Sequence, residues 1–371
     1  MHFQIVDNNQ KCKKVFNGSD LIDFSDDLPL SKTWKYSTHL RNSDVEYAYL
    51  YAGCEISDSC PGILKDWWDT TSKKVSSIIK STYHAKCDLD ETCIYDYIPD
   101  KILLDFLKCK QSIIQYVFEH LPRPKCYDIL EKAHILTEEM NGVYNHYDGK
   151  RSKTNYNIFG TRTGRLSNAK STIPILTMKR EQRRLLTPSN DLFVEFDFNA
   201  AELRTLLALS DKEQPHQDIH DWNRMQAKSE DIDREQMKKR TFAWLYNPEA
   251  SDRLLESIYD RNAILATYKT QTGIKTPFFR EIDCEDRKSL NYVVQSTSSD
   301  ICVEQAFKLR DFFKHSKTKV CYLLHDSVIL DFAKEDVQKF SEAKQIFSNT
   351  RFGNYVVNSS IGKNFGEMRK I

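Results

Sequence analysis

The segment "FDFNAAELR", residues 196–204, constrains this chain most. It closes an apolar run, residues 192–196, whose β-branched and aromatic side chains predict a strand. Leu203, Leu206 and Leu207 then follow the repeat of a helix. Asp197 ends the predicted strand, where an acid is costly unless it is paired or bound to a cation. The segment therefore predicts a sheet edge that carries a functional carboxylate.

The neighbouring polar residues of this segment have a simpler interpretation. Asn199 is a favourable N-cap, and Glu202 stands three residues later, which is the spacing of a capping box before an apolar helix. A capping box accounts for both residues and leaves Asp197 without a structural role.

A second acid occurs in the same situation in "VCYLLHDSVILDF", residues 320–332. This pattern predicts two strands joined by a polar tip of His325, Asp326 and Ser327. Two carboxylates on neighbouring strand ends are typical of sites that bind two Mg²⁺ ions, about 3.5 to 4 Å apart, for phosphoryl transfer. A single acid at a strand end is more often only a surface residue. The hypothesis therefore depends on what lies between Asp197 and Asp326.

Between them, Arg234, Lys238, Phe242 and Tyr246 recur at every fourth residue. On an α-helix these positions share one broad face, spread over roughly 18 Å. A nucleoside triphosphate along this face would meet the cations at its phosphates and the rings at its sugar and base. The alternative is an ordinary helix with a charged first half and a buried second half.

Longer helical patterns cover residues 229–245 and 286–310, and a pair of helices is predicted over residues 101–121 and 127–147. Two strands that are separated by so large a helical insertion predict an α+β fold, in which helical units project from a sheet.

The net charge of +1 gives no sign of a nucleic-acid partner. Residues 150–184 nevertheless hold ten Lys or Arg and the single acid Glu181, so one face can be basic. No apolar run is long enough to span a bilayer, and the N-terminus has no apolar core of signal-peptide type. With ten cysteines and no Cys-x-x-Cys pair, these features indicate a cytoplasmic protein, in the host cytoplasm if the chain is phage-encoded.

Five residues of the N-terminal part could in principle supply zinc ligands: Cys54, Cys60, His84, Cys87 and Cys93. The five residues between the first two cysteines make a wider spacing than zinc knuckles use, so we expect buried free thiols instead.

Taken in order, these segments resemble the motifs of the family A DNA polymerases, the group of bacterial repair polymerases and many phage replicases. The matching blocks are "TGRLS" at 163–167, "DFNAAELR" at 197–204, "DIH" at 218–220, the four-residue repeat at 234–246, "RKSLNYVVQ" at 287–295, "HDS" at 325–327 and "GKNF" at 362–365. The resemblance extends from about Thr161 to the C-terminus. It implies a right-hand polymerase fold of the α+β class, with an antiparallel palm sheet, helical fingers and a helical thumb, in a compact phage-like form.

By this resemblance the chain divides into five regions. Residues 1–95 match no motif, residues 96–155 form the helical thumb, and residues 156–215 form the first part of the palm. Residues 216–285 form the fingers, and residues 286–371 form the second part of the palm.

The resemblance also implies site residues. Asp197 and Asp326 would be catalytic carboxylates that hold two Mg²⁺ ions together with the backbone carbonyl of Phe198, and Lys238 would be a further catalytic residue. The substrate-binding residues would be Arg234, His220, Glu202, Phe242 and Tyr246.

Each of these has an implied task. Arg234, His220 and Lys238 hold the triphosphate. Glu202 is the steric gate, which closes the space that a ribose 2′-hydroxyl needs. Phe242 packs on the incoming sugar, and Tyr246 stacks near the template base. The residues that would contact primer and template are Arg165, Arg287, Asn291, Gln295 and His325.

The sequence departs from the family motifs at three places. Ser327 stands where the family usually has Glu, Asn247 replaces a Gly, and Ala200 with Ala201 replaces "QI". Ser327 is the change that we expect to alter the rate or the metal preference.

A 3′–5′ exonuclease would need several carboxylates on a domain of its own, and the only Asp-x-Glu near the expected place is Asp44 with Glu46. We interpret both as surface acids. Besides primer-template DNA and dNTPs, the partners could then include a separate exonuclease or a processivity factor, and no membrane.

Two alternatives remain. "HDS" and the fingers helix also resemble single-subunit RNA polymerases, although Glu202 and the "TGR" block favour DNA synthesis. The other alternative is a non-catalytic nucleic-acid-binding subunit, for which paired acids that repel phosphate, Asp197 and Asp326, have no use.

Overall fold

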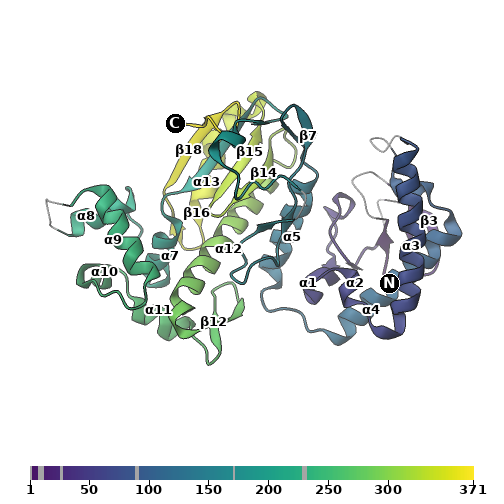
Figure 1. Ribbon diagram of the computed structural model, residues 1–371, viewed down its shortest axis with the longest axis horizontal. Coiled ribbons are helices and arrows are strands. Elements are labelled where there is room, and N and C mark those ends of the chain that lie inside the picture. Colours follow the sequence, from purple (N-terminus) through teal and green to yellow (C-terminus); the bar gives the residue numbers. More distant parts are fainter. Residues whose placement is uncertain (1, 7–11, 26–27, 88–91, 170–171, 228–231) are drawn as a thin grey trace. The chain divides into compact units, whose positions relative to one another are not determined.

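The computed structural model describes residues 2–6, 12–25, 28–87, 92–169, 172–227 and 232–371 (Figure 1). The chain forms two compact units, residues 1–142 and 143–371. None of the described helices is long and apolar enough to cross a membrane.

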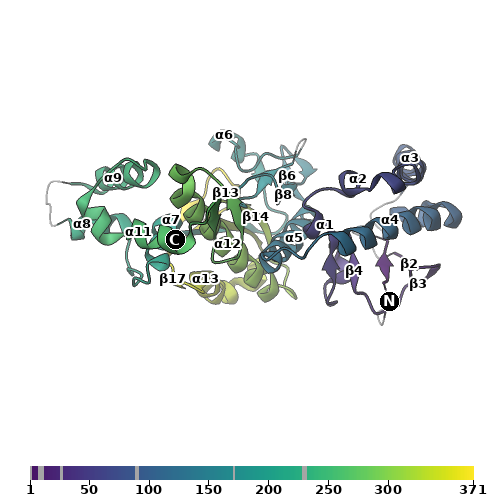
Figure 2. The ribbon, with the colours of Figure 1, turned by 90° about the horizontal axis from the view of Figure 1, so that it is seen from below.

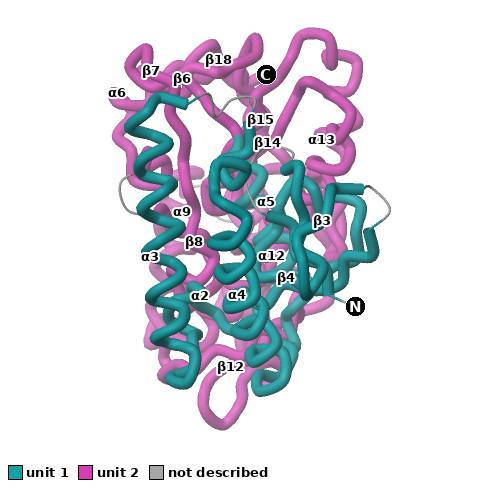
Figure 3. The backbone as a smooth tube through the Cα atoms, turned by 90° about the vertical axis from the view of Figure 1, so that its right-hand side faces the viewer, with its two compact units in different colours: residues 1–142 teal, residues 143–371 magenta. Residues whose placement is uncertain are grey.

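The first unit combines short strands with long helices. Helices α3 and α4 pack along each other, as Figure 3 shows, because each buries one apolar face. The strands are β1 (Gln4–Ile5), β2 (Lys14–Phe16), β3 (Leu21–Asp23), β4 (Lys32–Thr33) and β5 (Glu46–Tyr47). The helices are α1 (Ala48–Ala52), α2 (Ile56–Ser59), α3 (Gly62–His84), α4 (Asp100–His120) and α5 (Tyr127–Asn141), with short 3₁₀ turns η1 (Thr38–Leu40) and η2 (Ile94–Tyr97).

The predicted helical pair is confirmed for α4 and corrected for α5. Residues 145–147 were expected to continue the second helix, but they form strand β6 (Asn145–Tyr147). Asn145 is buried there and bonds to Asp331 and Tyr322, so contacts distant in the sequence override the local helical pattern.

The second unit is built on a five-stranded antiparallel sheet of order β14-β15-β11-β18-β19. The strands are β14 (Lys319–Leu324), β15 (Ser327–Phe332), β11 (Leu192–Phe198), β18 (Val357–Gly362) and β19 (Arg369–Lys370). The two strands predicted around residues 320–332 are confirmed as a hairpin, and the strand before Asp197 is confirmed as β11, at the centre of the sheet. This central place explains why the apolar run precedes Asp197.

The second unit also contains helices, and several of them gather beside the sheet. Figures 1 and 2 both show α8, α9 and α11 gathered at one end of this unit, with the sheet strands further along. The helices are α6 (Arg180–Arg183), α7 (Ala201–Leu209), α8 (Ile219–Gln226), α9 (Arg234–Tyr246), α10 (Arg253–Ile258), α11 (Arg261–Tyr268), α12 (Ser289–Phe312) and α13 (Phe340–Ser348). The 3₁₀ turns are η3 (Asp286–Lys288) and η4 (Lys334–Lys339).

The predicted helices over 229–245 and 286–310 correspond to α9 and to η3 with α12; residues 228–231 lie outside the described residues. One buried cluster joins Leu206 of α7, Leu255 of α10, Ile264 of α11 and Val294 of α12. The helical group is therefore anchored to the helix that follows the central strand. The remaining strands are β7 (Lys150–Ser152), β8 (Tyr156–Asn157), β9 (Ser167–Asn168), β10 (Leu186–Thr187), β12 (Gly273–Lys275), β13 (Glu281–Asp283), β16 (Asn349–Thr350) and β17 (Gly353–Asn354).

Candidate functional site

The two predicted carboxylates lie at adjoining ends of paired strands. Asp197 faces Ser327 in the register of β11 and β15, and Asp326 is the residue of the hairpin turn that directly precedes Ser327. The Phe198 N–H donates to the Asp326 carbonyl at 3.3 Å, which joins the two segments directly. His325 has a positive φ of 55°, as the first central residue of a two-residue hairpin turn usually requires. The turn thus places Asp326 beside Asp197.

These acids share a poorly solvated, negatively charged environment. Burial, with the charges of Asp326 and Glu195, raises the pKa of Asp197 to about 7. Burial also raises the pKa values of Asp326 and Glu195. No described Lys or Arg forms an ion pair with Asp197 or Asp326. The nearest polar partner of Asp197 is Asn358, whose Nδ2 lies 3.5 Å from Oδ2. Both acids are therefore partly desolvated and have no paired cation, so a bound cation would favour their ionised forms.

Glu195 lies beside the candidate carboxylates, and our reading of the sequence missed it. It stands two positions before Asp197, on the same face of β11, and its Oε1 accepts a hydrogen bond from the Ser327 hydroxyl at 3.3 Å. A signal was present, because an acid inside an apolar strand at an even spacing from another acid must share its face.

The donor set suits a magnesium ion better than a metal held by side chains alone. Among the described residues, no group of three or more His, Cys, Asp or Glu side chains could hold a metal ion. Mg²⁺, however, is usually held by one or two carboxylates, several waters and substrate phosphates. Asp197 and Asp326 fit that role. Phe198, the implied carbonyl ligand, ends β11 with its ring stacked on Phe347.

Glu202 does not cap α7, so the predicted capping box is wrong. Its Oε1 accepts from Arg165 Nη2 at 2.5 Å, and its Oε2 accepts from the Tyr246 hydroxyl at 2.6 Å. The N-cap position is Ala200, in the left-handed region at φ 52°. Side chains from two distant segments bind the carboxylate and take the place of the local backbone N–H. Three predicted site residues, Arg165, Glu202 and Tyr246, thus lie in one contact chain.

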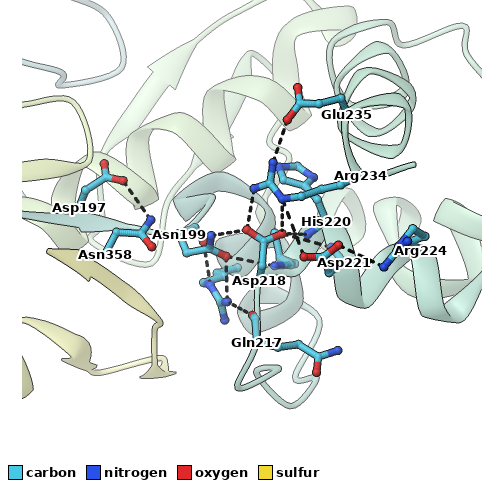
Figure 4. A network of polar contacts seen from close by, with 12 residues as sticks. Asp197, Asn199, Gln217, Asp218, His220, Asp221, Arg224, Arg234, Glu235 and Asn358 are labelled. Carbon is cyan, nitrogen blue, oxygen red and sulfur yellow. Dashed lines mark hydrogen bonds and ion pairs between the residues drawn. The ribbon is translucent and has the colours of Figure 1, made fainter. Parts of the chain in front are cut away.

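Asn199, the other half of the predicted capping box, belongs to a different network, drawn in Figure 4. Its Nδ2 donates to Asp218 Oδ2 at 2.8 Å, and its Oδ1 accepts from the Ile219 N–H and from buried Arg204. Asp218 also accepts from the His220 and Asp221 N–H groups and so caps α8. The strand that carries Asp197 is thereby tied to α8.

Arg234 is held by carboxylates in this arrangement. Its Nη2 and Nε donate to Asp218 at 2.7 and 3.2 Å, and its Nη1 donates to Glu235 at 2.9 Å (Figure 4). Burial opposes the charge of Asp218, yet the bonds from Arg234 and Asn199 hold its pKa well below the usual range. Asp218 belongs to the "DIH" segment, but the sequence of that segment does not indicate a bond to Arg234.

The helix prediction for the four-residue repeat is confirmed, since α9 runs over Arg234–Tyr246. Arg234, Lys238 and Phe242 are half-buried and Tyr246 is exposed, so they share the accessible face. The ring of Phe242 stacks on Tyr246 at 5.8 Å and meets His220 edge-on at 5.7 Å. His220 is 3% exposed and its Nδ1 has no hydrogen-bond partner in the described chain.

A pocket of about 430 Å³ lies between the end of α9, α11 and the start of α12. Its lining includes three predicted site residues, Tyr246, Arg287 and Asn291, and Asn291 Oδ1 is buried without a partner among the described residues. Gln295 is half-buried one turn further along α12. Three predicted nucleotide or DNA contacts, on α9, η3 and α12, thus line one space.

The "TGR" turn is fixed by a buried ion pair. Gly164 has φ +75°, and a Cβ there would lie 2.6 Å from the Arg280 guanidinium carbon. Arg280 in turn donates to both oxygens of Asp300 on α12, at 2.7 and 2.8 Å. The fully buried Asp300 therefore holds the arginine over which the turn closes.

Six of the ten cations in the predicted basic segment are exposed, and Lys153, Arg165 and Arg183 are half-buried. The exposed cations are Lys150, Arg151, Arg162, Lys179, Arg180 and Arg184; Lys170 lies outside the described residues.

In the first unit, Asp44 is exposed, and Glu46 accepts from Tyr51 at 3.0 Å and from Arg123 at 3.2 Å. The cysteines expected to be buried differ, since Cys93 is buried and Cys54, Cys60 and Cys87 are half-buried.

With this geometry established, comparison with known proteins identifies the fold. The chain is similar to the POL domain of Pol1 from M. smegmatis, solved in complex with DNA primer-template and dNTP, with a TM-score of 0.50 and 13% sequence identity. The similarity covers 85% of this chain and 67% of that chain. The chain has the fold of a DNA polymerase domain. No protein-family model and no curated protein matches the sequence.

Proposed function

We propose that the chain is a template-directed DNA polymerase, a nucleotidyltransferase of the family A type that adds dNTPs to a primer 3′-hydroxyl. The observation that carries this proposal is the pair Asp197 and Asp326, at adjoining ends of β11 and β15, partly buried and without an ion-pair partner among the described residues. The polymerase-domain fold supports it, because the neighbouring structure was solved with primer-template and dNTP.

In this proposal the five-stranded sheet is the palm, residues 216–285 are the fingers, and residues 96–155 are the thumb. The link from Glu202 to Tyr246 at 2.6 Å supports the first two assignments, because it connects the helix after β11 to the accessible face of α9. A nucleotide that bound along α9 would then have its sugar near Glu202.

Asp197, Asp326 and the Phe198 carbonyl would hold the two Mg²⁺ ions. Bound Mg²⁺ would favour the ionised primer hydroxyl and neutralise charge on the phosphates. The chain's own part is mainly positioning and charge neutralisation, since little covalent chemistry falls to the protein in phosphoryl transfer. Lys238, half-buried on α9, would contribute a positive charge to the triphosphate.

Arg234 would also bind the triphosphate, and its present partners limit the side from which phosphate can approach. All three of its guanidinium nitrogens donate to Asp218 or Glu235. Its side chain is 40% exposed, so phosphate oxygens could reach it from the solvent side. His220, buried against Phe242, would have to turn outward to take part.

The exposed cations of residues 150–184 would contact the phosphates of the duplex. Arg165, Arg287, Asn291, Gln295 and His325 would contact primer and template near the growing end. Because each neutralised phosphate releases counterions, affinity for primer-template should fall steeply with salt.

The test is primer extension on a defined template with Mg²⁺, with dNTPs and with rNTPs. The variant is Asp326→Asn, which removes the charge and keeps the shape. The control is Glu335→Gln, at an acid that is paired with Lys317 on the surface. We expect wild type and the control to extend with dNTPs, and Asp326→Asn to lose at least about a hundredfold in rate.

Other outcomes would change the assignment. Extension with rNTPs at equal efficiency would favour the RNA polymerase alternative. No extension by wild type, with intact primer-template binding, would favour a non-catalytic subunit.

A further inference from the structure

We infer that Glu195 adds negative charge behind the cation site of Asp197 and Asp326, without being a direct ligand, and that Ser327 positions it. The inference rests on the proposed function, because it concerns the metal ions of that same site. The motif "DFNAAELR" begins at Asp197, so the family resemblance assigns no role to Glu195.

The strand geometry places Glu195 beside the pair. Along β11, Val194, Phe196 and Phe198 are buried, while Glu195 and Asp197 alternate with them on the less buried face. Glu195 faces Ile329 in the register with β15, two positions from the place where Asp197 faces Ser327. The acid therefore lies on the face that carries Asp197, one pleat further into the sheet.

Ser327 connects this acid to the hairpin turn. Its hydroxyl lies 3.3 Å from Glu195 Oε1 and 3.3 Å from the Leu324 carbonyl. A hydroxyl has a single proton to donate, so it serves one of the two acceptors at a time. The bond to Glu195 holds the carboxylate toward the turn that carries Asp326.

Glu195 has both a cation, Arg183, and an acid, Asp326, near it. Asp326 and Glu195 act on each other electrostatically, and Glu195 acts on Asp197. Arg183 is the cation that faces Glu195, but its Nε donates to the Met178 carbonyl at 3.0 Å and its guanidinium lies over Phe365. In the described structure Glu195 has no ion pair. Three partly buried acids without a paired cation are costly unless a bound ion compensates them.

This arrangement gives Glu195 a distinct task. The two strand-end acids are the direct ligands, and Glu195 adds negative charge behind them. Its effect should depend on charge rather than on shape, and it should be smaller than that of a direct ligand.

The test is Mn²⁺ binding to the full chain without nucleotide or DNA, followed by the electron paramagnetic resonance signal of free Mn²⁺. We expect Glu195→Gln to weaken binding about five- to tenfold and Glu195→Asp to remain near wild type. Ser327→Ala should weaken binding by a smaller factor. Asp326→Asn should lose the site, and Glu335→Gln should bind as wild type does. Thermal unfolding of every variant without metal shows whether each one folds.

The outcomes separate the inference from the proposed function. If Asp326→Asn loses the site while Glu195→Gln binds as wild type, the role inferred for Glu195 is overturned and the polymerase proposal stands. If Glu195→Asp loses as much as Glu195→Gln, shape rather than charge matters, which also overturns the inference. If wild type shows no Mn²⁺ site that depends on Asp326, both are overturned.

Discussion

The Tyr246 hydroxyl at the end of α9 donates a hydrogen bond to Glu202 Oε2 on α7, at 2.6 Å. Arg165 donates to the other carboxylate oxygen at 2.5 Å, and only 11% of the Glu202 side chain is exposed. A carboxylate bound on both oxygens by different segments has little freedom to move. This rigidity is what a residue needs if it is to exclude a 2′-hydroxyl by occupying its space.

Glu202→Ala should therefore raise ribonucleotide incorporation. We expect the ratio of kcat/KM for dNTP over rNTP to fall at least about tenfold, because the space beside the sugar opens. Tyr246→Phe should lower the ratio less, since the carboxylate stays bound to Arg165. Single-nucleotide insertion kinetics measure both, with Glu335→Gln as control. An unchanged ratio in Glu202→Ala would remove Glu202 from this role.

The main elements of the second unit could be predicted because their signals are local. The apolar runs before Asp197 and around Asp326 predicted strands, and the helical pattern over residues 229–245 predicted α9, which the structure places at Arg234–Tyr246. Each depends on the side-chain period of a single segment. The pairing of Asp197 with the hairpin turn followed from the chemistry that would make both acids useful.

What could not be predicted depends on contacts between distant segments. The capping box of Asn199 and Glu202 is locally reasonable, but Asp218, Arg165 and Tyr246 bind these side chains instead. No local period shows which of several acids an arginine will bind.

The raised pKa of Asp197, about 7, predicts a pH-dependent stability. The folded chain holds this proton more tightly than the unfolded chain, so without metal the stability falls as pH rises from about 4 to 7. Asp197→Asn removes this loss. We expect the variant to unfold at a higher temperature than wild type at pH 8, with the difference shrinking toward pH 5.

The addition of Mg²⁺ is the control for this pH prediction. Added Mg²⁺ should raise the unfolding temperature of wild type at pH 8, because it binds the ionised folded form, and should leave Asp197→Asn unchanged. Differential scanning calorimetry measures both. Equal pH profiles for wild type and variant would show that the pKa of Asp197 is not raised in the folded chain.

Arg280→Ala should destabilise the second unit strongly. Asp300 is fully buried, and burial raises its pKa although Arg280 opposes the shift. Removing the arginine leaves a buried acid without its cation, at a cost of about 3 to 5 kcal/mol in free energy of unfolding. Urea unfolding measures the loss, and exposed Arg253→Ala is the control. Adding Asp300→Asn should restore part of the stability; no restoration would mean that Arg280 acts through packing on Gly164 alone.

The bond between Asp218 and Arg234 predicts a measurable coupling between α8 and α9. Their shortest contact is 2.7 Å, but the side chains are 25% and 40% exposed, so solvent screens the pair. We expect a double-mutant cycle of Asp218→Asn and Arg234→Ala to give a coupling of about 1 kcal/mol in free energy of unfolding. Glu235→Gln with Arg234→Ala is the matched control and should couple less, because Glu235 is 65% exposed. Because the bonds to Asp218 lower its pKa, the coupling should be full at neutral pH and should fade as pH drops below about 4. A coupling near zero at neutral pH would show that Arg234 is free to leave Asp218 at no cost, and that a triphosphate need not compete for it.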